Sequence, residues 1–340
     1  MIFRPAALRG GLSDTQKGSP MLIRKPDLYD EFHCIASACP DSCCQQWDVA
    51  VDGEKAALYR SLPGELGDRL RRFLKNEDGE VYLTLEGTRC PMWRADGLCR
   101  IQAELGEGAL CKTCREFPRL THDYGSFVEL GLELSCPEAA RLLLKQETWQ
   151  WVQQGQAEDV EPDMALLLRT RQRAMELTEL DRPLERLLYY SVSVQQVLDG
   201  AAEEIYESED LPEPEGRGDE ASFLNVFREL EILTPKWRKR LEGPSPRKLA
   251  QSDRAMLRYL ISRYWLQAIS DLDLVCRGKF MICAVVLVCL LGGDPVETAQ
   301  LFSKEIENDA ENVDALLDGA YALPGLTDRN LLALARMTEQ

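Results

Sequence analysis

The residues best suited to chemistry in this chain are cysteines gathered near its N-terminal end. Nine of the twelve cysteines in the 340-residue chain fall within one block. Cysteines that only fill a core would be scattered, whereas thiolates are preferred ligands of zinc and of iron–sulfur clusters. The block therefore predicts a soft-metal site, with buried free thiols as the alternative. Its members are Cys34, Cys39, Cys43, Cys44, Cys90, Cys99, Cys111, Cys114 and Cys136.

The spacing of these cysteines indicates a soft metal more clearly than it indicates which metal. Cys43 and Cys44 are adjacent, and only the Cys111-x2-Cys114 pair has the spacing of a zinc knuckle. Nine thiols exceed the four that one zinc ion takes, and their order differs from the bacterial ferredoxin pattern. We predict that the ligands are among the eight cysteines from Cys34 to Cys114, and leave zinc and an iron–sulfur cluster open.

Other reactive side chains are few. The only two histidines are His33 and His122, of which His33 is a weaker candidate ligand, so histidine-based acid–base catalysis is not expected. The chain has no phosphate-binding loop, no dinucleotide fingerprint, no nucleophile elbow and no His-Glu-x-x-His motif. Three further cysteines lie in an apolar stretch and are predicted to be core residues, namely Cys276, Cys283 and Cys289.

Composition narrows the class of protein. The formal net charge of −17 argues against a nucleic-acid binder, which needs a basic surface. The N-terminal 20 residues lack an apolar signal core, and the apolar run at 280–291 is shorter than the roughly 20 residues of a membrane span. We therefore expect a cytoplasmic protein without a membrane span, in which thiols stay reduced and available to metal.

The elements that must position the cysteines differ along the chain. Residues 1–21 are expected to be a disordered lead, with Met21 as a possible translation start. Residues 22–136 are predicted to form a cysteine-rich, loop-rich α+β region, with strands at 47–52 and 80–86. Residues 137–340 show helical periodicity and are predicted to form an all-helical, bundle-like domain with an acidic mobile loop at 208–220. The predicted fold class is mainly α.

The ordered run of motifs resembles a known family. Phe32-x-Cys34, the Cys43-Cys44 pair with Trp47, and Cys90-Pro91 are similar to the opening of the flagellin lysine-N-methylases. So are the run from Leu110 to Arg119 and the start of the helix at Ser135-Cys136-Pro137. These enzymes belong to a wider set of cysteine-rich proteins described as zinc- or iron-chelating. The resemblance covers about residues 22–145.

The resemblance implies an enzyme that methylates lysines of flagellin. It also implies S-adenosylmethionine as methyl donor and a [4Fe–4S] cluster, whose four ligands would include Cys39, Cys43, Cys44 and Cys111. The alternatives are a zinc-binding helical interaction protein without enzymatic activity, and an iron–sulfur redox or sensor protein. The sequence does not indicate an oligomeric state.

Methyl transfer to lysine needs the neutral amine, although a free lysine titrates near about 10.4. The site must therefore lower the pKa of that lysine or offer a base. Four residues near the cysteine motifs are candidate catalytic groups, and two arginines are candidates to bind the carboxylate of the donor. The catalytic candidates are Asp41, Asp48, Asp123 and Tyr124, and the donor-binding candidates are Arg115 and Arg119.

Overall fold

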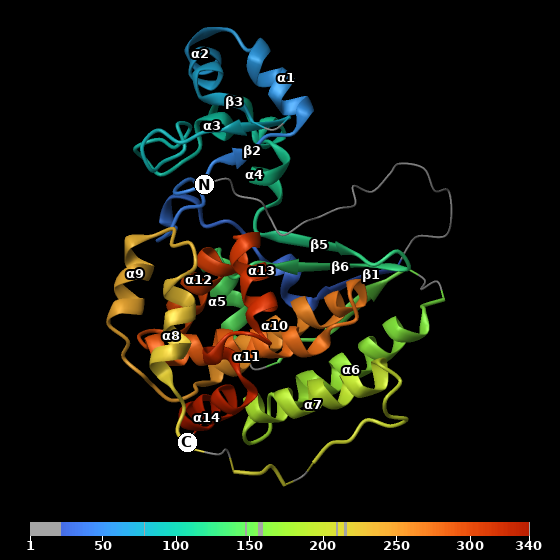
Figure 1. Cartoon of the computed structure of the whole chain (residues 1–340). Helices are drawn as coiled ribbons and strands as arrows, with labels where there is room; N and C mark the ends of the chain where they lie inside the picture. The colour runs from blue at the N-terminus through green and yellow to red at the C-terminus, as the bar shows by residue number, and fades with distance from the viewer. Residues whose placement is uncertain are drawn as a thin grey trace.

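The computed structural model describes residues 22–77, 79–146, 148–155, 159–208, 210–213 and 216–339. The predicted lead at 1–21 and the proposed start at Met21 lie outside the described residues. Within them the protein is mainly α, as predicted, with two sheets added to its helices (Figure 1).

One buried helix, α11 (Leu274–Leu291), is central to the larger of two hydrophobic cores. Its sequence is apolar on every face, and such a helix must be surrounded by protein or lipid. Among the described residues it is the one helix long and apolar enough to cross a membrane, but 94% of it is buried inside the protein. Asp273 caps its start by accepting a hydrogen bond from the Cys276 amide at 3.0 Å. Cys276, Cys283 and Cys289 are buried core residues, which confirms the prediction.

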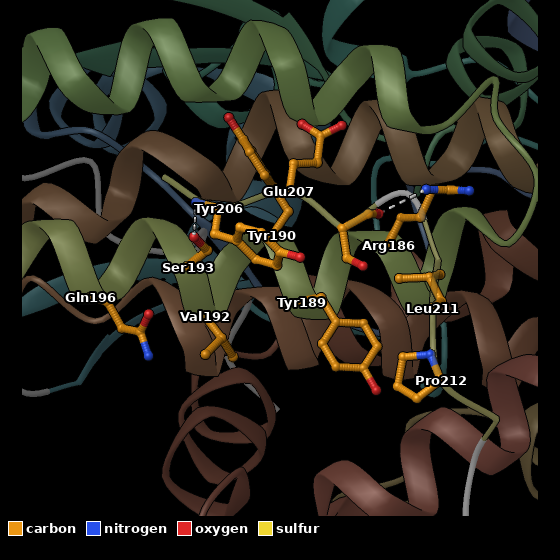
Figure 2. A pocket seen from close by; sticks show the side chains of 11 residues that line it. Arg186, Tyr189, Tyr190, Val192, Ser193, Gln196, Tyr206, Glu207, Leu211 and Pro212 are labelled. Carbon is orange, nitrogen blue, oxygen red and sulfur yellow. Dashed lines mark hydrogen bonds between the residues drawn. The ribbon is translucent and has the colours of Figure 1, made fainter. Parts of the chain in front are cut away.

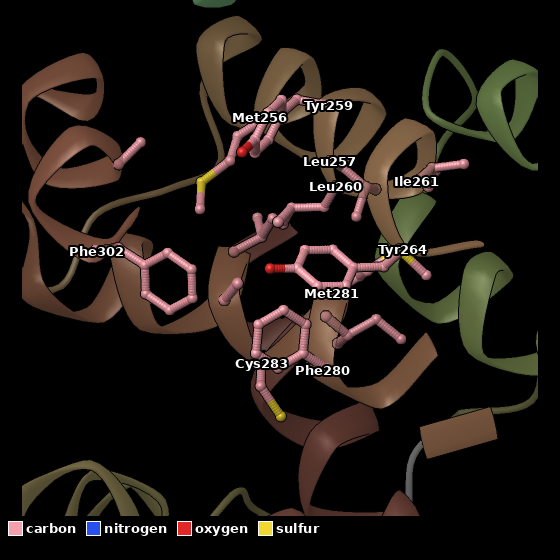
Figure 3. Packing of buried hydrophobic residues seen from close by; sticks show 14 of the residues in the cluster. Met256, Leu257, Tyr259, Leu260, Ile261, Tyr264, Phe280, Met281, Cys283 and Phe302 are labelled. Carbon is pink, nitrogen blue, oxygen red and sulfur yellow. The ribbon is translucent and has the colours of Figure 1, made fainter. Parts of the chain in front are cut away.

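Helices from the C-terminal two-thirds of the chain build the large core with α11. Aromatic rings take part in this packing: Phe280 of α11 lies 4.8 Å from the ring of Tyr264 and 6.3 Å from the ring of Phe302, measured between centroids (Figure 3). The other helices of this part of the chain are α5 (Pro137–Lys145), α6 (Pro162–Leu177), α7 (Pro183–Leu198), α8 (Glu220–Arg228), α9 (Pro235–Glu242), α10 (Gln251–Tyr264), α12 (Pro295–Phe302), α13 (Ala310–Gly319) and α14 (Asp328–Glu339). The turn η4 (Trp265–Ser270) follows α10, and η6 (Pro324–Leu326) precedes α14.

A four-stranded sheet covers one side of this helical assembly and departs from the prediction. Its order is β5 (Arg119–Asp123), β6 (Phe127–Leu132), β1 (Leu22–Pro26) and β7 (Trp151–Gln154). The parallel β1–β6 pair joins segments about a hundred residues apart, so short-range alternation does not reveal it. Strand β7 lies in the part that was predicted to be all helical, so that prediction was wrong for residues 151–154. The segment forms a strand because it pairs with the free edge of β1.

A second, small core lies apart from the helical assembly, at the top of Figure 1. It comprises α1 (Gly53–Ser61), α2 (Gly64–Phe73), α3 (Arg100–Leu105), α4 (Lys112–Glu116) and a sheet ordered β2 (Val49–Ala50), β4 (Glu80–Leu83), β3 (Leu74–Glu77). The predicted strands at 47–52 and 80–86 correspond to β2 and β4 of this core.

The two cores divide the chain by packing. The small core contains residues from Trp47 to Cys111, whereas the large core contains Leu22, Leu28 and Phe32 together with residues from Phe127 onward. The predicted domain boundary after residue 136 stays a prediction, because hydrophobic clusters do not define which segments fold alone. The described residues within 208–219 form neither helix nor strand.

Candidate metal and active site

The first cysteine loop connects the two cores. Phe32 is buried in the large core, Trp47 is buried in the small core, and the loop between them carries four cysteines. The short turns η1 (Asp27–Glu31) and η2 (Ala36–Ala38) shape the approach, and the Cys39 amide donates to the carbonyl of Ala36 at 3.1 Å. A Cβ added to Gly97 would lie 3.2 Å from the Cα of Ser37, so the turn before Cys99 touches this loop.

Cys43 and Cys44 form a hydrogen-bonded thiol pair. The hydrogen bond from Cys43 lowers the pKa of Cys44 to about 7, and the same bond raises the pKa of Cys43. Ser42 adds to the effect, since it also bonds the Cys44 side chain, and its hydroxyl accepts from the Cys44 amide at 3.2 Å. One sulfur of the pair is therefore available as a thiolate, the form that binds metal.

Cys111 and Cys114 form a second pair at the start of α4. A hydrogen bond from Cys114 lowers the pKa of Cys111 and raises that of Cys114. The Asp52 carboxylate holds this turn in place by accepting from the Lys112 amide at 2.7 Å. In the predicted knuckle, Cys111 is thus the sulfur that forms a thiolate more easily, and Cys114 is the thiol that donates the hydrogen bond to it.

Cys90 and Cys99 belong to the small core. The Cys90 amide donates to the carbonyl of Cys44 at 2.8 Å, and Trp93 pairs with Cys99 in an isolated bridge. Burial raises the pKa of Cys90 to about 12, and the nearby Cys44 thiol raises it further. Burial likewise raises the pKa of Cys99.

Cys136 and the two outer loop cysteines lie on the side of the large core. Burial raises the pKa of Cys136 to about 11, with smaller contributions from Cys39 and Cys34. Burial also raises the pKa of Cys39, whose thiol donates to the Asp41 carbonyl at 3.3 Å. Cys34 is exposed. The nine thiols of the block thus lie near enough to shift one another's pKa values, in a series of neighbours that runs from the small core to the large core.

The thiol chemistry fits a soft metal, but the side chains are arranged in pairs. Among the residues that the structure describes, no group of three or more histidine, cysteine, aspartate or glutamate side chains has the arrangement of a metal site. Eight candidate sulfurs share one locality and two of them readily become thiolates, which suits zinc or an iron–sulfur cluster. Binding would require thiols to rotate toward a common centre.

Asp41 ties the cysteine loop to the helical assembly. Its carboxylate accepts two hydrogen bonds from Lys304, at 2.7 and 2.9 Å, and one from Gln300 at 3.0 Å. Gln300 also donates to the carbonyl of Ser135 at 2.8 Å. The Lys304 ammonium is 2% exposed and lies 5.2 Å from the Trp47 ring centroid.

The other three predicted catalytic residues lie in different places. Asp48 accepts a hydrogen bond from the Leu85 amide at 2.9 Å, within the small-core sheet region. Asp123 is an exposed turn residue that accepts from the Gly125 amide at 2.8 Å. Tyr124 packs its ring 5.1 Å from Phe127, and burial raises the pKa of its hydroxyl. Of these four candidates, Asp41 is the one that lies among the thiols.

The two arginines predicted to bind the methyl donor differ in their contacts and in their exposure to solvent. Arg119 lies over the rings of Phe32 at 5.1 Å and Tyr29 at 5.9 Å. Arg115 is exposed on α4, where its guanidinium lies 3.7 Å from the Glu116 carboxylate and its side chain remains 42% exposed.

The two histidines are not part of the thiol cluster. His33 is exposed, next to Cys34. His122 lies on β5, where burial lowers its pKa to about 4 and its Nε2 atom is buried without a hydrogen-bond partner. It is therefore neutral at physiological pH.

A buried charged cluster beside the sheet had no signal in the sequence. Arg171 of α6 donates two hydrogen bonds of 2.7 Å to Glu129 of β6, and Arg24 pairs with the same carboxylate at 3.1 Å. Glu307 accepts from the hydroxyls of Tyr264 at 3.0 Å and Tyr259 at 3.2 Å. These polar residues are drawn from helices and strands far apart in sequence, so no local motif marks them.

The π-helical turn η5 (Ser303–Glu307) connects this cluster to the cysteine loop. Lys304 points to Asp41, Glu307 points to Tyr259 and Tyr264, and Glu305 accepts from the Leu233 amide at 2.8 Å. Burial raises the pKa of Glu305 to about 7, and one of its oxygens is buried without a partner. Short π-helical segments are frequent at functional sites.

A separate cleft lies on the outer face of α7. Its volume is about 330 Å³, and its lining residues include Tyr189, Tyr206 and Pro212 (Figure 2). It is lined by α7 and by the segment from Tyr206 to Pro212, and the cysteine block contributes no residue to it. We therefore place the candidate site at the junction of the two cores and not in this cleft.

The fold and the site define a mainly helical protein with a cysteine-rich small core and a thiol cluster suited to soft metal. Over 132 residues the chain is 34% identical to the flagellar biosynthetic protein FliU of Salmonella muenchen, covering 36% of this chain and 76% of FliU. Over 129 residues it is 33% identical to lysine-N-methylases of Salmonella typhimurium and Salmonella choleraesuis, covering 36% of this chain. The chain belongs to the family of FliU and these lysine-N-methylases, as the motifs indicated.

The similarity is partial. The alignment spans only 32% of the length of each lysine-N-methylase. No family model matches the chain, and no solved structure matches it either.

Proposed function

We propose that the chain is an iron–sulfur-dependent protein lysine N-methyltransferase that acts on flagellin in the cytoplasm, with S-adenosylmethionine as methyl donor. The observation that carries this proposal is the gathering of nine thiols at the junction of the two cores, in a chain related to lysine-N-methylases. Cysteine thiolates are the ordinary ligands of a [4Fe–4S] cluster.

The thiols of Cys39, Cys43, Cys44 and Cys111 remain the favoured ligands within the eight predicted cysteines. Cys44 and Cys111 are already the thiolate-forming members of their pairs. When bound through four cysteines, the cluster would have no free iron position, and it would hold the two sides of the junction together. The methyl donor would then be held by protein side chains, and Arg115, which is exposed on α4, would pair with its carboxylate.

The reaction requires a proton acceptor. The lysine nitrogen forms a bond to the methyl carbon while the carbon–sulfur bond breaks, and S-adenosylhomocysteine leaves. The lysine must first give up one proton to a base. Asp41 is the proposed acceptor because its backbone carbonyl accepts from the Cys39 thiol and its side chain retains 27% exposure.

The first experiment is a methylation assay under anaerobic, reducing conditions. Full-length protein with its cluster is mixed with S-adenosylmethionine and flagellin, and methyl groups on lysine are counted by mass spectrometry. Broad absorption near about 400 nm verifies the cluster. Methylated flagellin supports the proposal. Intact cluster without methylation favours the redox or sensor alternative, and colourless zinc protein without methylation favours the interaction module.

A matched pair of variants separates catalysis by Asp41 from its structural role. Asp41→Asn removes the base, whereas Lys304→Gln breaks the same tie and leaves the carboxylate in place. We expect Asp41→Asn to lower the methylation rate about 10²-fold or more, as loss of a general base does, with Lys304→Gln less affected. Equal losses in the two variants would remove Asp41 from the chemistry.

A further inference from the structure

We propose that the thiols form two metal sites, a closed zinc site in the small core and a separate iron–sulfur site at the junction of the two cores. The small-core site is Cys44, Cys90, Cys99 and Cys111. The junction site is Cys34, Cys39, Cys43 and Cys136, of which Cys136 was not among the predicted ligands. The inference rests on the proposed function and deepens it, because it assigns the cluster to the junction site and gives it Cys34 and Cys136 in place of Cys44 and Cys111.

The small-core site is assembled by backbone hydrogen bonds. The Cys90 amide donates to the Cys44 carbonyl at 2.8 Å, which places these two residues side by side. The Trp93 amide donates to the Cys90 carbonyl at 3.0 Å, and the bridge from Trp93 to Cys99 closes the turn that follows. These hydrogen bonds hold the backbones of Cys44, Cys90 and Cys99 close together.

Cys111 completes this set from another direction. It is buried in the same hydrophobic cluster as Cys90, and Cys44 and Cys99 pack against that cluster. The Tyr59 hydroxyl donates to the Ala109 carbonyl at 2.7 Å and so anchors the segment that carries Cys111. Two of the four cysteines are buried and two are half-buried. Four cysteines are the donor set of a structural zinc ion, which needs no open coordination position.

The junction site is assembled across the two regions. Gln300 donates both to the Asp41 carboxylate and to the Ser135 carbonyl, so one side chain holds the loop from Cys39 to Cys43 against the residue before Cys136. The Cys39 thiol bonds to the Asp41 carbonyl within that loop. Cys136 itself is buried in the large core.

The junction site is the more open of the two. Two members of the junction site, Cys34 and Cys43, are exposed, although Cys136 is buried. The small-core site has no exposed member, since Cys44 and Cys99 are half-buried and the other two are buried. A cluster that serves the reaction must lie near groups open to substrate, whereas a structural zinc ion can be enclosed. The open site is therefore assigned the iron–sulfur cluster.

Two sites also account for the number of thiols. Either zinc or a [4Fe–4S] cluster takes four ligands, so one centre would leave five of the nine cysteines unused. Two centres use eight, and the remaining Cys114 is exposed and bonded to Cys111. Among the described residues no three of these side chains share a metal-binding arrangement, so filling either site requires the thiols to turn toward a common centre.

The test is a metal count on anaerobically prepared full-length protein. We expect about four irons, about four sulfides and about one zinc per chain. Cys136→Ser should lose the iron and the absorption near about 400 nm while keeping the zinc. Cys90→Ser should lose the zinc. Cys283→Ser, in α11, is the matched control and should keep both metals.

Several outcomes would overturn the proposal. These are iron without zinc in the unaltered protein, or unchanged iron in Cys136→Ser that still melts cooperatively. If Cys136→Ser fails to fold, Cys34→Ser replaces it, since Cys34 is exposed and not part of a core. Two metals without methylation of flagellin would contradict the proposed function and leave this inference standing, so the two are separable.

Discussion

The small core and the large core are stabilised in different ways. The large core is built around α11, in which nearly every residue is buried, and includes fully enclosed charged groups such as Glu307. The small core has 14 buried residues, of which Cys90 and Cys111 are two. A cluster of that size supplies little hydrophobic stabilisation, so a bound metal has more to contribute there. The cysteines therefore stabilise the small core, and they form the candidate site where the small core meets the large core.

Removing metal should have the largest effect and should fall on one region. A structural zinc ion contributes apparent binding energies of about 10 kcal/mol or more, and that energy is folding energy. We expect chelation to abolish amide-exchange protection in α1 and β4 while α10 and α11 keep theirs. Equal loss of protection in both regions would end the distinction between them.

Breaking the buried charge cluster should affect the other region. Glu307→Ala leaves Arg263, which lies 3.3 Å away, without its buried partner. Losing one partner of a buried ion pair costs about 3–5 kcal/mol, so denaturant unfolding of the large core should shift by that amount. Glu311→Ala, on the exposed face of α13, is the control. A loss below about 1 kcal/mol would show that the cluster is not structural.

The pH dependence of Glu305 should be intermediate in size. Its folded pKa of about 7 lies above the unfolded value, so folding favours the protonated form. Its stabilising contribution is complete below the unfolded pKa and is lost as pH rises through about 7, a change of up to about 3 kcal/mol.

The variant Glu305→Gln should lack this pH dependence. Its stability relative to the unaltered protein should therefore rise between pH 4.5 and pH 8, measured by urea unfolding at a series of pH values. Glu311→Gln serves as the control, and parallel pH curves for Glu305→Gln and the unaltered protein would contradict the prediction.

Removing a helix cap should have the smallest effect on stability. The same substitution, aspartate to alanine, can be made at a cap in each of the two cores. Asp294 caps α12 with one hydrogen bond, from the Glu297 amide at 2.9 Å. Asp52 accepts from the Lys55 amide at 3.1 Å and also from the Lys112 amide at 2.7 Å. Each cap hydrogen bond lost costs about 1 kcal/mol, so Asp52→Ala should lose more thermal stability than Asp294→Ala. The reverse order would mean that the tie from α1 to α4 contributes nothing.

Local sequence patterns predicted the helices and strands whose structure depends mainly on their own residues. The helix at 272–291 was found because its apolar sequence is continuous, and α11 begins at Leu274. The helix α2 was missed, as were the strands β1, β5 and β7, which are short and depend on distant partners. The strand β6 needs β1 on one side, and nothing within either segment specifies the other.

The candidate site was predicted by residue type and not by arrangement. Cysteine density pointed to the thiols, and the motif from Leu110 to Arg119 pointed to the family. Local patterns could not predict the partners of Asp41, since Lys304 is 263 residues away along the chain. They could not predict the buried cluster around Glu307 either, since Tyr264 is 43 residues from it.

The sequence by itself determined the chemistry on offer: thiols in one block, few histidines and a helical majority. Those properties follow from composition and short-range periodicity, which need no partner to be read. Only the tertiary structure decided which thiols face the small core and which face the large one. That outcome depends on hydrogen bonds and packing between segments far apart in the chain, and short-range patterns do not encode them.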